Sequence, residues 1–363
     1  MTRVFLIRHA EAEGNTYRRA HGSFDGYISG RGHIQIEQLK ARFLNEEVSA
    51  VYSSDLYRAR TTAKAISQPR GLDVVTNEKL REVDMGVWED EAWGDLYFRE
   101  PEMIRAFSCD PEKWRAEGCE SYLLVQERMY NTIRSIADRH DGRTIAFFSH
   151  GYAIRSFLYK TSGADAKDFL AIPYFDNTAV TLLIYNKGSF RTEYMGDNSH
   201  LKTEASTFAN QTWWRSEEES AMENMYYMPL DETRDNELLK ILGKEGINRG
   251  NASKEYTALI TDGAIGMIGL GDPPDSHPND CAETGWIEYL YLAPDYRGKC
   301  YEVQLIGLAM SEFRKQGKVK MRVAIPTDDD TIKFYNKYEF YTISKSYERY
   351  LIEKDITLPG KDE

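Results

Sequence analysis

Hydrophobic and polar positions follow two alternating patterns along the first part of the chain. Short apolar runs at residues 2–10 and 144–151 predict buried strands. Apolar residues three and four positions apart predict helices over residues 29–44 and 55–68. Strands that alternate with helices indicate an α/β fold whose sheet has much parallel pairing.

Five further segments extend this pattern. They are strands at residues 49–55 and 73–83, a helical region over 95–139, a helix over 151–163 that Gly163 ends, and a hairpin over 179–197. After Leu201 the pattern stops, and the following segment combines acidic residues with the aromatic pair Trp213 and Trp214. We therefore predict a first domain over residues 1–205 and a linker over 206–221 that packs against another part of the protein.

The last part of the chain has its own order of elements and predicts a second domain over residues 222–358. Two apolar runs around Asp262 and Gly263 are a strong hairpin signal. The other elements expected here are a helix near 237–246, a strand at 286–294, a helix at 301–317, a strand at 318–327, a helix at 329–340 and a closing strand at 343–353. This order predicts a mixed-sheet α/β domain.

Composition narrows the classes of function. The 363 residues carry a formal net charge of −12, which argues against nucleic acid or an anionic membrane as a partner. No apolar stretch approaches the ~18 residues of a membrane span, and the N-terminus resembles a strand more than a signal peptide. The four cysteines form no C-x-x-C pair, so neither a zinc site nor a disulfide framework is expected, and a reducing cytoplasm is the expected location.

Chemically active side chains follow four of the predicted elements in the first domain. Arg8 and His9 end the first strand, Arg58 begins a helix, Glu82 follows a predicted strand, and His150 ends a buried strand. The carboxyl ends of parallel strands share one rim of a sheet, so these side chains are expected to converge there.

This set of side chains suits phosphoryl transfer. Two guanidiniums and a helix N-terminus form a cradle for an anion. One imidazole can attack phosphorus while the other donates a hydrogen bond, and a carboxylic acid can protonate the departing oxygen. Fixed donors neutralise the developing charge, so the scheme requires no metal ion.

The segments LIRHAEAEGN, SSDLYRARTTA, LREVDMGVWE and SHG, in this order, resemble the histidine phosphatase superfamily, the phosphoglycerate-mutase-like group. The resemblance implies a three-layer α/β/α domain in which His9 becomes a phosphohistidine. It also implies that Arg8, Arg58 and His150 hold the phosphoryl group. Glu82 would be the proton donor and later the base, and Asn15 would lie on the substrate side.

Two features modify what the resemblance implies. His21 stands where the family usually has Gln, so we expect it to contact the substrate. The segment from Glu82 to His150 lacks the long insertion that closes over the site in cofactor-dependent mutases. An open site admits water to the phosphoenzyme, which favours a phosphatase over a mutase.

The stretch GWIEYLYLAPDYRGKCYEVQLIGLAM resembles the central motif of GNAT-type N-acetyltransferases. The resemblance implies that acetyl-CoA is the cofactor and that Tyr335 protonates its thiolate. The residues that it places around the cofactor are Leu292, Arg297, Gly298, Lys299, Cys300 and Tyr301. Cys300, Glu302 and Glu339 stand where the family prefers small residues, and an anion at position 302 would repel a diphosphate. Glu288 is a candidate base toward an amine, or a residue that faces solvent.

The sequence therefore predicts a cytoplasmic, metal-independent phosphomonoesterase that acts on a small phosphorylated metabolite, followed by a GNAT-like domain. Two alternatives stay open at this point. One is a phosphoglycerate-type mutase. The other is an acetyltransferase for a small amine, or an acyl-CoA sensor, in which the phosphatase-like domain is accessory.

Overall fold

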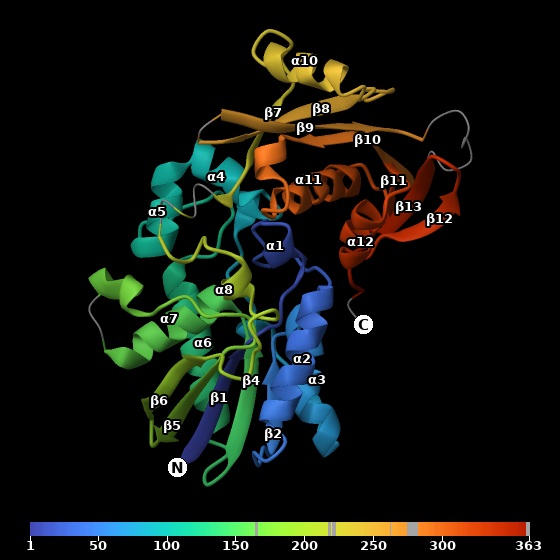
Figure 1. Ribbon diagram of the computed structural model, residues 1–363. Helices are drawn as coiled ribbons and strands as arrows, with labels where there is room; N and C mark the ends of the chain where they lie inside the picture. Colours follow the sequence, from blue (N-terminus) through green and yellow to red (C-terminus); the bar gives the residue numbers. More distant parts are fainter. Residues whose placement is uncertain (164–165, 217–218, 220–222, 262, 274–281, 361–363) are drawn as a thin grey trace.

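Two β-sheets organise the chain in the computed structural model (Figure 1). The structure describes residues 1–363 except 164–165, 217–218, 220–222, 262, 274–281 and 361–363. The first sheet has the strand order β3-β2-β4-β1-β5-β6, and the second has the order β12-β13-β11-β10-β9-β8-β7. Among the described helices, none has both the length and the apolar character that crossing a membrane would need.

The first sheet is parallel except at one side. Its strands are β1 (Thr2–Arg8), β2 (Ala50–Ser53), β3 (Val74–Thr76), β4 (Thr144–Ser149), β5 (Val180–Asn186) and β6 (Ser189–Asp197). The helices around it are α1 (Glu13–Thr16), α2 (Gly30–Arg42), α3 (Tyr57–Ser67), α4 (Trp93–Arg99), α5 (Pro101–Cys109), α6 (Tyr122–Ala137) and α7 (Gly151–Ser162), and α8 (Thr207–Asn210) follows the sheet. Strands β1 to β4 pair in parallel, whereas β5 and β6 form the antiparallel hairpin that the sequence predicts.

Different helices cover the two faces of this sheet, because successive residues of a strand point to opposite faces. In β1, Phe5 and Ile7 belong to a core that includes residues of α2 and α3. Val4 and Leu6 belong to a second core that includes residues of α6 and α7. The three-layer α/β/α arrangement is thereby confirmed.

The second sheet also lies between helices (Figure 1). Its strands are β7 (Tyr226–Pro229), β8 (Lys254–Ile260), β9 (Gly263–Gly271), β10 (Thr284–Leu292), β11 (Lys320–Pro326), β12 (Tyr341–Lys345) and β13 (Arg349–Asp355), and its helices are α10 (Asn236–Lys244), α11 (Tyr301–Lys315) and α12 (Asp329–Lys337). Residues of α10 share one core with β9 and β10, whereas those of α11 and α12 share another core with the sheet. The predicted hairpin is β8–β9, although Asp262 lies outside the described residues.

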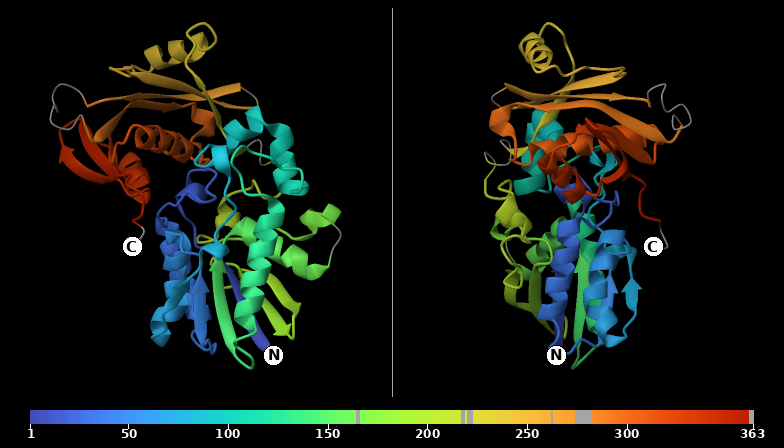
Figure 2. Two further views of the ribbon diagram at one scale, coloured as in Figure 1. Left: turned by 180° about the vertical axis from the view of Figure 1, so that it is seen from behind. Right: turned by 45° about the vertical axis from the view of Figure 1, so that its right-hand side comes forward.

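The two parts meet where α11 lies over the loops that follow β1 (Figure 2). Tyr17 is 5% exposed and belongs to the hydrophobic core of the second part. Arg314 donates to both carboxylate oxygens of Glu13, at 3.0 and 3.2 Å, with both side chains nearly buried. Arg19 donates to the hydroxyl of Ser311 at 2.8 Å. The segment after β1 is therefore anchored in the second part of the molecule.

Three predicted elements differ from the structure. The strand predicted at residues 73–83 ends early, because the Asn77 side chain caps a 3-10 helix, Glu78–Leu80. The helical region predicted over 95–139 is divided into α4, α5 and α6, with a break at Glu100 before the proline that begins α5. The single closing strand predicted at 343–353 is the hairpin β12–β13.

Candidate functional site

Two histidines lie side by side at the carboxyl ends of the central parallel strands. Arg8 pairs in register with Ser149 between β1 and β4, so the next residue of each chain segment, His9 and His150, leaves the sheet at the same rim. Their ring centroids are 5.1 Å apart. The predicted convergence of these two imidazoles is therefore present.

The hydrogen bonds of His9 select which ring nitrogen is available. Its Nδ1 lies 2.7 Å from the carbonyl oxygen of Ala10 and donates to it, which leaves the lone pair on Nε2. Burial lowers the pKa of His9 well below its usual value, and the nearby guanidiniums of Arg58 and Arg8 lower it further. A neutral imidazole with a free Nε2 is what nucleophilic attack requires.

Both predicted arginines line the same cavity as His9. Arg8 donates through Nη1 to the carbonyl of Phe175, and its buried Nε has no protein partner. Arg58 donates to the carbonyl oxygens of Phe24 and Gly22 at 2.9 and 2.7 Å. Arg58 thus fixes the loop beside the site, whereas the Nε of Arg8 remains available to an anion.

His150 and Glu82 meet at the start of α7. His150 precedes the first residue of this helix, and neither of its buried ring nitrogens has a protein partner. Burial lowers the pKa of His150 well below its usual value, with Arg58 adding to the effect. The carboxylate of Glu82 accepts from the backbone N–H groups of Tyr152 and Ala153 at 3.0 and 2.8 Å. Glu82 is thereby held beside His150, although it follows a 3-10 turn and not the predicted strand.

The two predicted substrate-side residues line the cavity but are already hydrogen-bonded. Asn15 accepts from the backbone N–H of Ala12 at 3.1 Å. The Nε2 of His21 lies 3.2 Å from a carboxylate oxygen of Asp90, which also accepts from Arg19 at 2.8 Å. Burial lowers the pKa of His21 although Asp90 opposes this effect. His21 is therefore oriented by a buried carboxylate.

The cavity that His9 lines is much larger than a phosphate group. Its volume is about 600 Å³, and the linker residue Trp213 forms part of its wall. The side chain of Gln211 donates to the carbonyl of Asn15 at 3.0 Å and accepts from the indole N–H of Trp213 at 2.9 Å. The linker therefore packs against the candidate site. From the aromatic pair, the sequence predicts that the linker packs against another part of the protein, but not which part.

Arg18 and Tyr174 also line the cavity, and the sequence predicts neither of them as a site residue. The guanidinium carbon of Arg18 lies 4.8 Å from the ring centroid of Trp213, and its Nε donates to Asn224 at 2.9 Å. The Tyr174 ring lies edge-on to Trp213, with centroids 5.3 Å apart. No sequence pattern marks these residues, because only tertiary packing brings them to the cavity.

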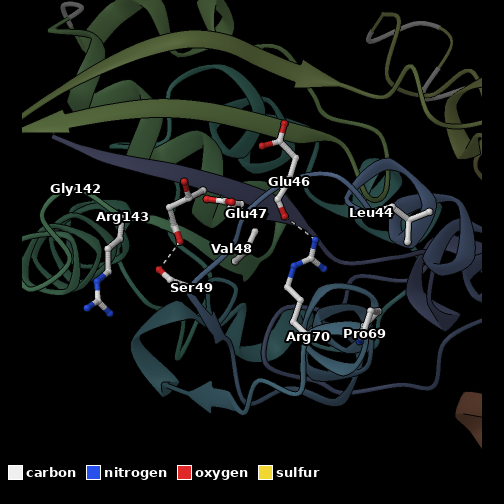
Figure 3. Close-up of a pocket in the computed structure, with 10 residues that line it drawn as sticks. Leu44, Glu46, Glu47, Val48, Ser49, Pro69, Arg70, Gly142 and Arg143 are labelled. Atoms are coloured by element: carbon white, nitrogen blue, oxygen red, sulfur yellow. Dashed lines mark hydrogen bonds between the residues drawn. The ribbon is translucent and has the colours of Figure 1, made fainter.

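A second hollow, of about 560 Å³, lies at the opposite ends of the strands, where β2 and β4 begin (Figure 3). Arg70 lines it and donates to the carbonyl of Glu46 at 2.8 Å, and Ser49 donates to the carbonyl of Thr144 at 2.9 Å. These polar groups hold loops together. The hollow contains none of the predicted site residues.

The predicted cofactor loop connects β10 to α11. Leu292 ends β10, and the Nε of Arg297 donates to its carbonyl oxygen at 2.8 Å. Cys300 has a φ of 66° just before α11, so the loop keeps a left-handed turn without a glycine there. Lys299 is exposed, and Tyr301 is the first residue of α11.

The N–H groups of this loop do not fit a diphosphate as they stand. The amide of Gly298 donates to a carboxylate oxygen of Glu302 at 2.6 Å. A diphosphate would compete with this carboxylate for the same donor and would be repelled by its charge. The sequence indicates that the Glu302 carboxylate conflicts with a bound diphosphate. In the structure this carboxylate already accepts the hydrogen bond that a diphosphate would need.

Strand β10, Glu288 and Tyr335 form the rest of the second candidate site. Strand β10 pairs with β11 only as far as Ile287 and then runs on unpaired on that side. Glu288 lies at an irregularity in the pairing of β10 with β9, and burial raises the pKa of its carboxyl. Tyr335 is 6% exposed, and burial, followed by the charge of Glu302, raises the pKa of its phenol.

Among the described residues, no group of three or more His, Cys, Asp or Glu side chains is arranged to hold a metal ion. Cys119 and Cys300 are thiols, and Cys281 lies outside the described residues.

Two sequence models match successive parts of the chain. That of the histidine phosphatase superfamily (branch 1) matches residues 4–198, and that of the acetyltransferase (GNAT) family matches residues 210–340. Phosphoserine phosphatase 1 of Hydrogenobacter thermophilus is 30% identical over 169 residues, which are 47% of this chain and 80% of that protein. A probable phosphoglycerate mutase GpmB of Escherichia fergusonii is 29% identical over 210 residues, which are 56% of this chain and 97% of that protein.

Solved structures resemble the first part of the molecule. Bacillus stearothermophilus YhfR is 28% identical with a TM-score of 0.54, over 56% of this chain and all of that one. A mycobacterial glucosyl-3-phosphoglycerate phosphatase, 22% identical with a TM-score of 0.52 over 54% of this chain and 99% of that one, shares the fold. Because the first sequence model covers more than half of the chain, this protein belongs to the histidine phosphatase superfamily (branch 1) and carries a GNAT-type domain after it.

Proposed function

We propose that the first domain hydrolyses phosphomonoesters through a phosphohistidine at His9. One observation carries the proposal: the rings of His9 and His150 lie 5.1 Å apart at one rim, and the buried ring nitrogens of His150 and the buried Nε of Arg8 have no protein partner. Buried hydrogen-bonding groups without partners are costly unless a ligand satisfies them. A phosphoryl group has the charge and the acceptors that these donors need.

The proposed reaction has two steps. Nε2 of His9 attacks phosphorus, the P–O bond to the alcohol breaks, and Glu82 gives its proton to the departing oxygen. Glu82 then takes a proton from water, whose oxygen attacks the phosphohistidine and restores the free imidazole. Arg8 and His150 donate to the phosphoryl oxygens through nitrogens that have no protein partner, and Arg58, which lines the cavity, adds positive charge.

The test is to trap the phosphoenzyme. Wild-type protein incubated with a labelled phosphomonoester, without added metal, should retain label that acid releases and alkali does not. His9→Ala should retain none, whereas His33→Ala, the same change at an exposed histidine of α2, should behave as wild type. Wild-type turnover in His9→Ala would rule out the mechanism.

A mutase is the second candidate, because probable phosphoglycerate mutases are among the relatives. An assay with 3-phosphoglycerate and trace bisphosphoglycerate separates the two activities. Release of inorganic phosphate without isomerisation supports the phosphatase, and isomerisation without release supports the mutase.

Acetyl transfer to an amine by the second domain is a separate proposal. The separation of β10 from β11 after Ile287 and the raised pKa of Glu288 support it, whereas the Glu302 carboxylate on the loop opposes it. Calorimetric titration with acetyl-CoA tests the binding step, and absence of heat in the wild type would remove acetyl transfer. The expected location of the protein is the cytoplasm, where thiols such as Cys119 persist.

A further inference from the structure

We propose that the substrate of the first domain is a phosphomonoester whose alcohol carries a planar ring, and that the linker residue Trp213 holds this ring. The inference rests on the proposed phosphatase function and names the substrate class for the same cavity. It starts from the size of the cavity. About 600 Å³ is within the ~300–1,000 Å³ of pockets that hold drug-sized ligands, and a three-carbon phosphate would leave much of it empty.

The chemistry of the walls points to a ring. Six aromatic residues that line the cavity are only partly buried, so each presents part of its surface to the open space: Trp93, Tyr97, Phe107, Tyr174, Trp213 and Trp214. Aromatic faces that remain accessible in a concave site favour stacking or edge contacts with a planar group. A short polar alcohol, such as a serine or glycerate group, would gain little from such walls.

Trp213 is the best placed of these residues because its indole is held from several directions. Its N–H donates to Gln211, Tyr174 lies edge-on to it, and the Arg18 guanidinium lies 4.8 Å from its centroid. Arg18 is itself buried, and burial lowers its pKa to about 10. A ring fixed in this way loses little conformational entropy when a substrate packs against it.

The position of Trp213 also ties ring recognition to catalysis. Gln211 connects the indole to the carbonyl of Asn15, six residues after His9. A ring held at Trp213 is therefore positioned relative to the nucleophile loop by direct hydrogen bonds. The residue lies beyond the part of the chain that the phosphatase family model matches and within the part that the GNAT family model matches.

The test compares 2-phenylethyl phosphate with n-propyl phosphate. Both release alkoxides of similar basicity, so the ratio of their kcat/KM values reports recognition of the ring and not leaving-group chemistry. In the wild type we expect the ratio to exceed about tenfold, the value that about 1.4 kcal/mol of ring contact supplies. Trp213→Ala should bring the ratio close to one, and Trp213→Phe should keep most of it.

The ratio does not depend on how much of a variant is folded. Equal kcat/KM values for the two esters in the wild type, or an unchanged ratio in Trp213→Ala, would overturn the assignment of substrate class while leaving the phosphatase intact. Failure to hydrolyse any phosphomonoester would instead overturn the proposed function. A nucleoside 5′-monophosphate, as a larger ring-bearing ester, should follow 2-phenylethyl phosphate in its response to Trp213→Ala.

Discussion

The ion pair between Arg314 of α11 and Glu13 of α1 connects the two domains next to the loop that follows His9. Both side chains are at most 10% exposed, and the N···O distance is 3.0 Å. Arg314→Met removes the cation and leaves the carboxylate buried. Removing one partner of a buried pair costs about 3–5 kcal/mol. For cooperative unfolding of a chain of this size, the lower value corresponds to a fall in Tm of about 4 °C.

The pH dependence of this variant follows from Glu13. Burial raises the pKa of Glu13, and Arg314 opposes the rise. Without Arg314, the folded-state pKa rises further above the unfolded value. The charged carboxylate then destabilises the folded state, and stability is lost as the pH increases through the folded pKa. The fall in Tm that Arg314→Met causes should therefore be smaller at pH 5 than at pH 8.

Differential scanning fluorimetry of wild type, Glu13→Gln, Arg314→Met and the double variant measures the coupling. The double variant should recover part of the loss, because no unpaired charge remains buried. Arg349→Met, at an exposed arginine of β13, is the matched control and should change Tm little. Two results would refute the reasoning. One is a fall in Tm in Arg314→Met that is no larger than in the control, and the other is a double variant whose Tm is no higher than that of Arg314→Met.

At the second site, Glu302→Ala should strengthen acetyl-CoA binding about tenfold in calorimetric titration, because it frees the Gly298 amide and removes a repelling charge; an unchanged Kd would show that this carboxylate does not block the loop. Burial raises the pKa of Asp95 to about 6, so stability should be lost as pH rises from about 4 to 6. Asp95→Asn should therefore have a higher Tm than wild type at pH 7 and an equal Tm at pH 4, and a constant difference would contradict this. Because the pKa of His9 is lowered, kcat/KM should hold its value as pH falls through 6.5, and a fall that begins above 6.5 would contradict the neutral nucleophile.

The sequence predicts the rim of the candidate site better than its surroundings. Arg8, His9 and His150 end strands whose apolar runs are unmistakable, and parallel pairing then requires them to meet. Glu82 is at the rim for a different reason from the predicted one, since its carboxylate binds the backbone at the start of α7. That contact joins segments about 70 residues apart and leaves no periodic trace in the sequence.

The walls of the cavity could not be predicted from pattern. Trp213 and Arg18 lie in irregular segments, where neither a helical nor a strand period assigns a face. Their places depend on contacts with residues such as Gln211 and Asn224, which only the assembled molecule brings near. In the second domain, by contrast, a charge at position 302 beside a loop that is expected to bind a diphosphate is a local conflict, so the sequence alone indicates it.

Tyr17 has a practical consequence for experiments on the first domain alone. Its ring packs in the hydrophobic core of the second domain. The contact with α11 is so close that a Cβ atom added at Gly307 would lie 2.6 Å from the Cβ of Tyr17. A shortened protein that stops at residue 205 would expose this phenol ring to water beside the candidate site. Inhibitor screens and crystallisation trials on such a fragment would sample a disturbed site, so they are better carried out on the full chain.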